Sequence, residues 1–379
     1  MGQRIAVISH AAVIAANQEP FAALAAAGAD VTVIAPRSLA TDLRGRVHLE
    51  ALRGSNARII GLPVLLGGYR RWLGGQRGIH VIVYQRLAKA LDAIRPDVVF
   101  LEEEPYSFAA LQTMLWCRSR RIPFVVHQNQ NLKRRLPPPF PMIGAQVLRA
   151  AAGATVRNRS AERLLRAQGF KGPIIDFPHA VDAARYAIDG NDPSLTRPVV
   201  GFVGRLVPEK GLCELIEALG AVRAQAPASL LVVGDGPQRV ECEARAHRAL
   251  VPARFLGAIA HDAVPAWIRA MDLVVVPSQP TATWTEQFGR VPIEANAAGV
   301  PVIVSDAGEL PATVEATGGG LVAASGEELQ RHLVMLLTDA DARTRLGDTG
   351  RTGVRERFTH RAIARTLLEL LASVRAVRT

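Results

Sequence analysis

Long hydrophobic runs, cysteine pairs and aromatic residues are all scarce in this chain of 379 residues. No apolar stretch reaches the roughly 18–20 residues that a membrane-spanning helix needs, and residues 1–8 lack the layout of a signal peptide. Cys117, Cys213 and Cys242 form an odd set without a C-x-x-C pair, so we interpret them as reduced structural thiols. These absences favour a cytoplasmic globular protein, with peripheral association on the inner face of a membrane left open.

Sequence patterns for metal binding and nucleic-acid binding are missing as well. The nine His and three Cys residues show no metal-ligand spacing. The single Asp-x-Asp, at 339–341, lies among C-terminal helical residues, which argues against a metal–diphosphate site. No G-x-S-x-G elbow and no G-x-G-x-x-G follows the first strand. The missing ligand spacing predicts that there is no metal cofactor. Because aromatics are only 5% and no nucleic-acid motif occurs, we expect no nucleic-acid partner either.

The composition that is present is globular, but its charge is unevenly distributed. Hydrophobic residues make up 49% and charged residues 21%, enough for large buried cores. The formal net charge is +11, and residues 1–195 account for all of it, with 25 Lys and Arg against 14 Asp and Glu. Residues 196–379 hold 20 of each sign. A basic half beside a neutral half indicates two domains with different partners.

Short runs rich in Val and Ile alternate with Ala-rich helical stretches along the whole chain. Strands are expected at 5–9, 30–34, 97–101, 124–127 and 154–157 in the first half, and at 199–203, 230–233, 273–276 and 302–305 in the second. This alternation predicts an α/β protein with parallel, doubly wound sheets. Two Rossmann-like domains that face a central cleft are the architecture that fits best.

The domain boundaries follow from the composition between the two halves. Residues 189–194 are rich in Gly, Asn, Asp and Pro, which is typical of a linker. We therefore predict an acceptor-binding domain over 1–185 and a donor-binding domain over 186–360. Residues 361–379 are expected to form an amphipathic helix that crosses back to the first domain and packs across both.

The most informative segment follows the strand expected at 273–276. Glu286 lies in a loop, and Glu294 lies one turn into the next helix. The backbone N–H groups of residues 287–289 would sit at the N-terminus of that helix, where free amides and the helix dipole favour a phosphate. A carboxylate one turn further, such as Glu294, can accept hydrogen bonds from a ribose diol.

These residues carry a resemblance to a known family. The pattern E-Q-F-G-x-x-x-x-E-A-x-A-x-G-x-P-V from residue 286 resembles the signature of retaining GT-B glycosyltransferases of the family 4 type. Further motifs of that family are matched in order at 201–211, 232–237, 255–257 and 276–278. The resemblance implies a metal-independent enzyme that moves a sugar from a nucleoside diphosphate-sugar to a hydroxyl acceptor and keeps the anomeric configuration. It implies attack on the front face, with the leaving phosphate taking the acceptor proton.

The resemblance also assigns residues of the second half to the donor. Arg205 and Lys210 would contact the diphosphate, where fixed cations stabilise the developing negative charge. Glu286 would reach the transferred sugar, and Glu294 would bind the ribose. Ile293 would pack against the nucleoside. The remaining donor contacts would come from Gly204, Gln287, Phe288 and Gly289.

Candidates in the first half belong to the acceptor side and to catalysis. The run at 121–127 resembles the family's strand that ends in a His contacting the sugar, so His127 is expected to be catalytic, together with Arg205, Lys210 and Glu286 of the second half. Family members often carry a Gly-rich loop after the first strand, but residues 9–19 contain no glycine. We therefore expect His10 and Asn17 to line the acceptor pocket with their side chains.

Glu103 and Glu104 are further acceptor-side candidates, since they follow the strand expected at 97–101. Three adjacent carboxylates are usually a solvated turn, and that interpretation stays open here.

Two other functions also stay open. One is a nucleotide-sugar isomerase of the 2-epimerase type on a similar scaffold, and the other is a non-catalytic protein that binds a polyanion. The segments at 69–73 and 133–141 mix basic and large apolar residues that can lie on anionic lipid. They favour a glycan or lipid-linked acceptor and a role in polysaccharide biosynthesis, whereas donor base and sugar leave no trace in the sequence.

Overall fold

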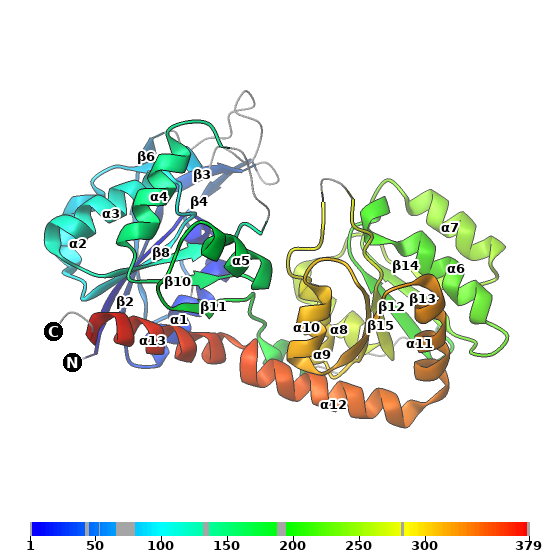
Figure 1. The fold of residues 1–379 in the computed structure, drawn as a ribbon. Coiled ribbons are helices and arrows are strands. Elements are labelled where there is room, and N and C mark those ends of the chain that lie inside the picture. The colour runs from blue at the N-terminus through cyan, green and yellow to red at the C-terminus, as the bar shows by residue number, and fades with distance from the viewer. Residues whose placement is uncertain are drawn as a thin grey trace. The chain divides into compact units, whose positions relative to one another are not determined.

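The computed structural model describes residues 2–41, 45–52, 54–65, 80–131, 136–187, 195–281 and 284–376. The linker expected at 189–194 and the basic segments 69–73 and 133–135 lie outside the described residues. The chain forms two compact units (Figure 1): unit 1 comprises Met1–Pro178 and His360–Thr379, and unit 2 comprises His179–Thr359. The structure divides the chain at Pro178 instead of residue 185. The reason is that Val181 and Tyr186 already pack in the core of unit 2.

Unit 1 is built on a seven-stranded parallel sheet with the order β11-β10-β9-β8-β1-β2-β5. Its strands are β1 (Arg4–Ser9), β2 (Asp30–Pro36), β5 (Arg58–Leu62), β8 (Val98–Glu102), β9 (Phe124–Gln128), β10 (Gly153–Val156) and β11 (Ile174–Asp176). Two antiparallel pairs accompany it, namely β3 (Ser38–Thr41) with β4 (Gly45–His48) and β6 (Val64–Leu65) with β7 (Val83–Tyr84). The Val- and Ile-rich runs form strands because both faces of such a sheet are covered and apolar.

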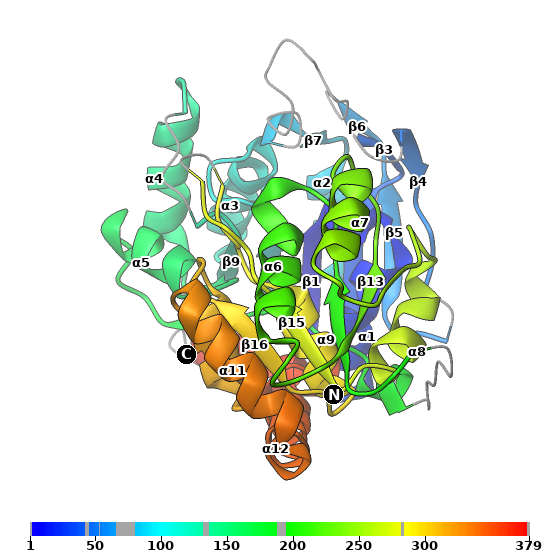
Figure 2. The ribbon, with the colours of Figure 1, turned by 90° about the vertical axis from the view of Figure 1, so that its right-hand side faces the viewer.

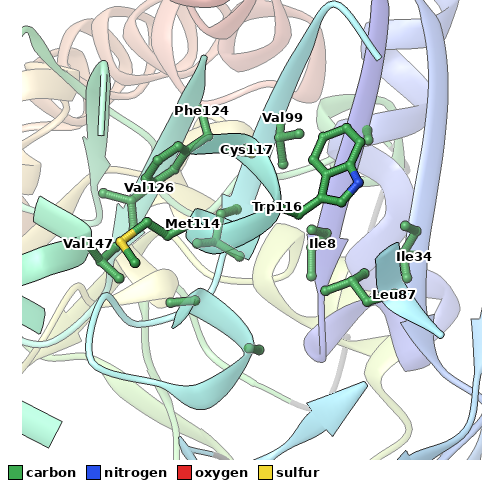
Figure 3. Packing of buried hydrophobic residues seen from close by; sticks show 14 of the residues in the cluster. Ile8, Ile34, Leu87, Val99, Met114, Trp116, Cys117, Phe124, Val126 and Val147 are labelled. Carbon is green, nitrogen blue, oxygen red and sulfur yellow. The ribbon is translucent and has the colours of Figure 1, made fainter. Parts of the chain in front are cut away.

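Helices cover both faces of this sheet. One face carries α1 (Glu19–Ala26) and α13 (His360–Ala376), and the other carries α2 (Leu87–Ile94), α3 (Phe108–Arg120), α4 (Phe140–Ala150) and α5 (Arg159–Ala167). Successive side chains along a strand point to opposite faces of the sheet, so each strand packs against both helix layers. Phe100 of β8 packs against Phe21 of α1, with ring centroids 6.3 Å apart. Its neighbour Val99 points into the opposite cluster, where Figure 3 shows it near Cys117 and Trp116 of α3.

The C-terminal helix α13 belongs to unit 1. It contacts α1, β8 and β11, and the carbonyl of Leu371 accepts a hydrogen bond from Gln3 Nε2 at 3.2 Å. At its first residue, His360 Nε2 lies 2.7 Å from Glu19 Oε2. The amphipathic pattern that predicts this helix therefore reports the face that packs on unit 1.

Unit 2 repeats the architecture on a six-stranded parallel sheet with the order β14-β13-β12-β15-β16-β17. Its strands are β12 (Val199–Val203), β13 (Ser229–Val233), β14 (Ala253–Phe255), β15 (Leu273–Val276), β16 (Val302–Ser305) and β17 (Gly320–Ala323). One face carries α6 (Leu212–Val222), α7 (Arg239–Arg248) and α11 (Gly326–Thr338). The other carries α8 (Val264–Arg269), α9 (Arg290–Ala297), α10 (Leu310–Thr317) and α12 (Ala340–Arg357). Helix α6 contacts both α7 and α11, as Figure 2 shows from that side.

The predicted α/β architecture with parallel sheets is therefore confirmed. Each sheet has a point where the strand order reverses, between β1 and β8 in unit 1 and between β12 and β15 in unit 2. In open parallel sheets, ligands bind at the carboxyl ends of the strands that flank such a point. The segments that follow these four strands are thus where side chains for binding and chemistry are expected.

Within the described ranges, no helix combines the length and hydropathy of a bilayer span.

Candidate functional site

In unit 2, the loops after β12, β13 and β14 approach each other through glycines. Gly234 has φ +136°, and a Cβ at that position would lie 1.8 Å from the carbonyl oxygen of Gly204. Its N–H donates to the carbonyl of Gly257 at 2.9 Å. Only glycine allows so close an approach. The packed loops fix the course of the chain after β12, where Arg205 and Lys210 follow.

Lys210 and Glu286 form an ion pair at the reversal point of unit 2. Lys210 Nζ lies 2.6 Å from Glu286 Oε2, and Ser278 Oγ donates to the same oxygen at 3.2 Å. The ammonium also lies 5.0 Å from the ring centroid of Trp284, a cation–π contact. The sequence analysis did not name Ser278 or Trp284 as site residues. Their positions between β15 and Glu286 are the signal that would have found them.

The segment from Glu286 to Gly289 presents backbone amides at the start of α9. Gly289 is left-handed at φ +69°, and a Cβ there would lie 2.5 Å from a side chain of α10. The carbonyl of Glu286 accepts from the N–H of Glu309 at 3.1 Å, and that of Phe288 from Thr313 Oγ1 at 3.0 Å. Among the described residues, the N–H groups of Phe288 and Gly289 have no protein acceptor. Free N–H groups at a helix N-terminus favour an anion, and the phosphate contact predicted for these residues stays a prediction.

The two other predicted donor residues of α9 are buried. Burial raises the pKa of Glu294, although the nearby Arg290, whose Nη2 lies 3.3 Å from Glu294 Oε1, lowers it. Ile293 has no exposed surface and lies in the hydrophobic core of unit 2. The contact of Ile293 with a nucleoside stays a prediction. Its side chain points to the sheet because α9 buries that face, and it supports the helix from inside.

A small pocket joins most of these groups. It is lined by Phe202, Val203, Lys210, Val275, Val276, Glu286, Gly289, Arg290 and Val291. The structure thus brings Lys210, Glu286 and Gly289 together at the carboxyl ends of β12 and β15. Arg205 is exposed and is not among the residues that line this pocket, and within the described ranges no carboxylate pairs with it. Gln287, which follows Glu286 in the segment before α9, is also exposed.

In unit 1, the reversal point holds a buried acid cluster. We use this name for Glu102, Glu103 and Glu104 with their partners His10, Tyr84 and Arg157. Glu103 Oε1 accepts from the backbone N–H of His10 at 2.8 Å and from Tyr84 Oη at 3.4 Å, and Glu103 Oε2 lies 2.7 Å from His10 Nδ1. Burial alone lowers the pKa of His10, but the charge and hydrogen bond of Glu103 outweigh it and raise that pKa.

The other two carboxylates of the acid cluster are held separately. Glu102 Oε2 accepts from Ser9 Oγ at 2.7 Å, and its Oε1 lies 3.9 Å from Arg157. Glu104 Oε1 accepts from the backbone N–H groups of residues 129 and 130, at 3.2 and 3.0 Å. The solvated turn that three adjacent carboxylates suggest is therefore wrong, because donors from distant elements hold each one.

The pKa of Glu104 gives unit 1 a testable pH dependence. Burial raises this pKa to about 7, against the lowering effect of the two backbone N–H groups. In the unfolded chain the carboxyl of Glu104 has the ordinary pKa of 4.5. Between this pKa and that of the folded state, the folded state holds more protons, so it loses stability as the pH rises from one value to the other. We expect Glu104→Gln to remove this loss. The free energy of unfolding of the variant minus that of wild type should therefore be higher at about pH 8 than at about pH 4, by about 3 kcal/mol. Urea unfolding of both proteins across this range measures the difference, and a constant difference would contradict the assignment.

His127 ends up in the interior of unit 1. It lies in β9 and is 3% exposed, with Nδ1 2.8 Å from Thr155 Oγ1 of β10 and its ring centroid 5.6 Å from that of Phe177. The catalytic role predicted for His127 stays a prediction.

Asn17 serves the loop that follows β1. Its side chain is exposed, and Nδ2 donates to the carbonyl of Ala11 at 2.8 Å. The loop without glycine folds into two short 3-10 turns, Ala11–Val13 and Ala15–Gln18. Its fixed shape comes from the buried Gln18, whose Nε2 donates to the carbonyl of Ala12 at 2.7 Å and whose Oε1 accepts from Leu52. The sequence analysis did not name Gln18. It named Asn17, whose amide donates a hydrogen bond within its own loop.

Two glycosyl transferase family models match the chain, one in each unit. The model described as Glycosyl transferase 4-like domain matches residues 15–176, and the model described as Glycosyl transferases group 1 matches residues 188–353. The chain belongs to the group 1 glycosyl transferases. Solved structures cover it from end to end, as sucrose-phosphate synthase from Thermosynechococcus elongatus does with 22% identity, a TM-score of 0.65, and 99% of this chain and 100% of that one covered. Anabaena HepE in complex with UDP has 18% identity and a TM-score of 0.66, over 98% of this chain and 100% of that one.

These structural neighbours confirm the two-domain GT-B fold. Curated relatives match over shorter stretches. The 2-deoxystreptamine glucosyltransferase of Streptomyces kanamyceticus is 35% identical over 209 residues, 51% of this chain and 53% of that protein. A GDP-mannose-dependent phosphatidylinositol monomannoside mannosyltransferase of Mycobacterium tuberculosis is 34% identical over 190 residues, 48% of this chain and 49% of that protein. The chain therefore spans about half the length of the curated relatives it matches.

Proposed function

We propose that this group 1 glycosyl transferase moves a sugar from a nucleoside diphosphate-sugar to a hydroxyl acceptor with retention of the anomeric configuration. The observation that carries the proposal is the Lys210–Glu286 pair beside the amides of Phe288 and Gly289, at the reversal point of the unit 2 sheet. Lys210 and Gly289 line one pocket, and a cation beside backbone N–H donors matches a diphosphate. Relatives named as glucosyl- and mannosyltransferases, and a neighbour solved with UDP, support this choice over an isomerase.

The reaction assigns each of these groups a task. The bond between the anomeric carbon and the diphosphate oxygen breaks, and its electron pair leaves with the diphosphate. Lys210, Arg205 and the α9 amides stabilise that charge. The acceptor oxygen bonds to the anomeric carbon on the same face, and its proton passes to the leaving phosphate oxygen. Glu286 holds Lys210 in place with Oε2 and has Oε1 for a hydroxyl of the transferred sugar.

Nucleotide binding tests the donor half of this proposal directly. We expect one of UDP, GDP and ADP to raise the melting temperature, since a ligand at 100 times its Kd stabilises the native state by about 2.7 kcal/mol. Lys210→Ala is expected to weaken this shift. Glu356→Gln, on an exposed part of α12, is the matched control and should keep it. The absence of a shift with all three nucleotides would count against a nucleoside diphosphate site.

We also propose that the reaction needs no metal, because Lys210 and Arg205 supply the positive charge that the leaving diphosphate requires. Chelation with EDTA is expected to leave the transfer rate within about twofold of the untreated enzyme, whereas a metal that contributes to catalysis is worth several kcal/mol. Loss of activity with EDTA that Mg²⁺ or Mn²⁺ restores would contradict this part of the proposal.

For the acceptor, we propose a glycan or lipid-linked molecule that the enzyme glycosylates at the cytoplasmic face of a membrane, in polysaccharide biosynthesis. The positive charge of residues 1–195 supports an anionic surface as a partner. Vesicle flotation tests it: binding should increase with the fraction of anionic lipid and decrease with salt. Vesicle binding that does not change with the fraction of anionic lipid would argue against a membrane partner.

A further inference from the structure

We propose that the acid cluster of unit 1 binds the acceptor through hydroxyl groups and rejects an anionic group at this position. The inference rests on the proposed function and adds the chemical class of the acceptor: an uncharged, hydroxyl-rich ring. Three independent features of the cluster carry it, namely its charge, its unpaired acceptor atoms and the orientation of His10.

The charge at the reversal point of unit 1 is negative at close range. Glu102, Glu103 and Glu104 follow one another out of β8, and the cations that contact them are Arg157, 3.9 Å from Glu102, and His10, 2.7 Å from Glu103. In the described parts of unit 1, Glu104 has no such cation and accepts only from backbone N–H groups. Above the pKa of Glu104, which burial raises to about 7, a carboxylate or phosphate brought to Glu104 would meet a like charge in a buried setting, where repulsion is strong.

The same place holds buried acceptor atoms that lack donors. Glu104 Oε2, Gln128 Oε1 and Gln130 Oε1 are each buried without a hydrogen-bond partner within the described chain. Glu104 is 8% exposed and Gln128 is fully buried. The amide oxygens of Gln128 and Gln130 only accept hydrogen bonds, and Glu104 only accepts them when it is ionised. A molecule that satisfies these atoms must therefore bring donors.

These three side chains surround one turn. Gln128 Nε2 donates to the carbonyl of Gln130 at 3.1 Å, and the N–H of Gln130 donates to Glu104 Oε1 at 3.0 Å. The side chain of Gln128 is thus fixed by its amide nitrogen, which leaves its oxygen as the unpaired atom. The unpaired oxygens therefore lie around the segment 128–130, directly after β9, and next to the carboxylates that follow β8.

His10 is the accessible member of the cluster. Its side chain is 21% exposed, and Glu103 holds the ring by Nδ1 and the backbone by its N–H. Since Nε2 is at the opposite edge of the ring, the anchor at Nδ1 directs Nε2 away from Glu103. A hydroxyl-bearing ring can thus contact His10 first and extend its other hydroxyls toward Glu104.

The experiment compares two acceptors that differ in one group, with the donor identified by nucleotide binding. Methyl α-D-glucoside carries CH₂OH where methyl α-D-glucuronide carries a carboxylate. At about pH 9, where Glu104 is ionised, we expect wild type to form product from the glucoside at least tenfold faster, measured by mass spectrometry at equal concentrations. Glu104→Gln removes the charge and keeps the shape, and it should lower this preference at least threefold by improving use of the glucuronide. Glu356→Gln is the control and should keep the wild-type preference.

Three results would overturn the inference. The first is equal or better use of the glucuronide by wild type, which needs no variant. The second is an unchanged preference in folded Glu104→Gln, as expected if ordered water alone occupies the unpaired oxygens. The third is no product from either acceptor although the donor binds. If no donor binds at all, the proposed function fails instead.

Discussion

Lys210→Ala is expected to lower kcat/KM for sugar transfer by roughly 10²–10³, which is the effect of removing one preorganised charge from a developing anion. Lys210 is held in place twice, by Glu286 at 2.6 Å and by the ring of Trp284 at 5.0 Å, so little reorganisation is needed when the diphosphate leaves. Initial rates with saturating acceptor measure the loss. Arg331→Ala removes an exposed cation of α11 that pairs with Glu328, and it should leave the rate unchanged. An equal effect of both substitutions would contradict a local role for Lys210.

Lys210→Ala also leaves Glu286 without its cation. Since Glu286 is mostly buried and keeps only Ser278 as a donor to the paired oxygen, we expect a loss of about 1–3 kcal/mol in the free energy of unfolding. Lys210→Met tests the two effects separately, because its side chain retains the packing of the stem. The catalytic loss should persist in Lys210→Met, even where stability is partly recovered.

Gly234→Ala is expected to destabilise unit 2 by about 3 kcal/mol or more, the sum of strain at a positive φ and overpacking. The new Cβ would lie 1.8 Å from the carbonyl oxygen of Gly204, and backbone cannot move aside as a side chain can. The displaced loop is the one that leads to Arg205 and Lys210, so transfer should fall as well. Urea unfolding measures the first effect and initial rates the second.

Gly326→Ala provides the matched control for Gly234→Ala. Gly326 lies at the start of α11, and a Cβ there meets nothing within 4 Å. The free energy of unfolding should therefore change by less than about 1 kcal/mol, in the direction of greater stability. Similar losses in both variants would mean that the close approach of Gly234 and Gly204 does not constrain the fold.

The donor side of the molecule was predictable because its signals are local in sequence. The strands expected at 199–203 and 273–276 match β12 and β15 residue for residue, since each is a short apolar run bounded by turn residues. The pairing of Lys210 with Glu286 was not predicted, although both were named. It depends on two loops that are far apart in sequence and adjacent in the sheet.

The acceptor side was less predictable because its partners are distant in sequence. Nothing local to Glu103 indicates that His10 and Tyr84 will hold it, so three adjacent carboxylates resemble a solvated turn. The burial of Ile293 was not predicted for a related reason: a position carried over from a motif does not reveal which face of α9 is buried. Tertiary contacts determine both the hydrogen bonds of Glu103 and the burial of Ile293, and these contacts cannot be identified from a single sequence.

The structure also changes what the net charge of +11 implies. The excess of Lys and Arg lies in residues 1–195, yet the strand ends of unit 1 carry three carboxylates against Arg157 and His10. The excess of Lys and Arg in residues 1–195 and the carboxylates of the acid cluster together fit an acceptor molecule that is anionic as a whole. Such an acceptor would present an uncharged hydroxyl group to the acid cluster.

The configuration of the product tests the central claim most directly. The enzyme is incubated with the nucleoside diphosphate-sugar that binds, together with the acceptor, and the anomeric proton of the product is followed by NMR from the first minutes. The account predicts that the new glycosidic bond has the configuration of the donor, because the acceptor attacks the face that the diphosphate leaves. A product with the opposite configuration would contradict it.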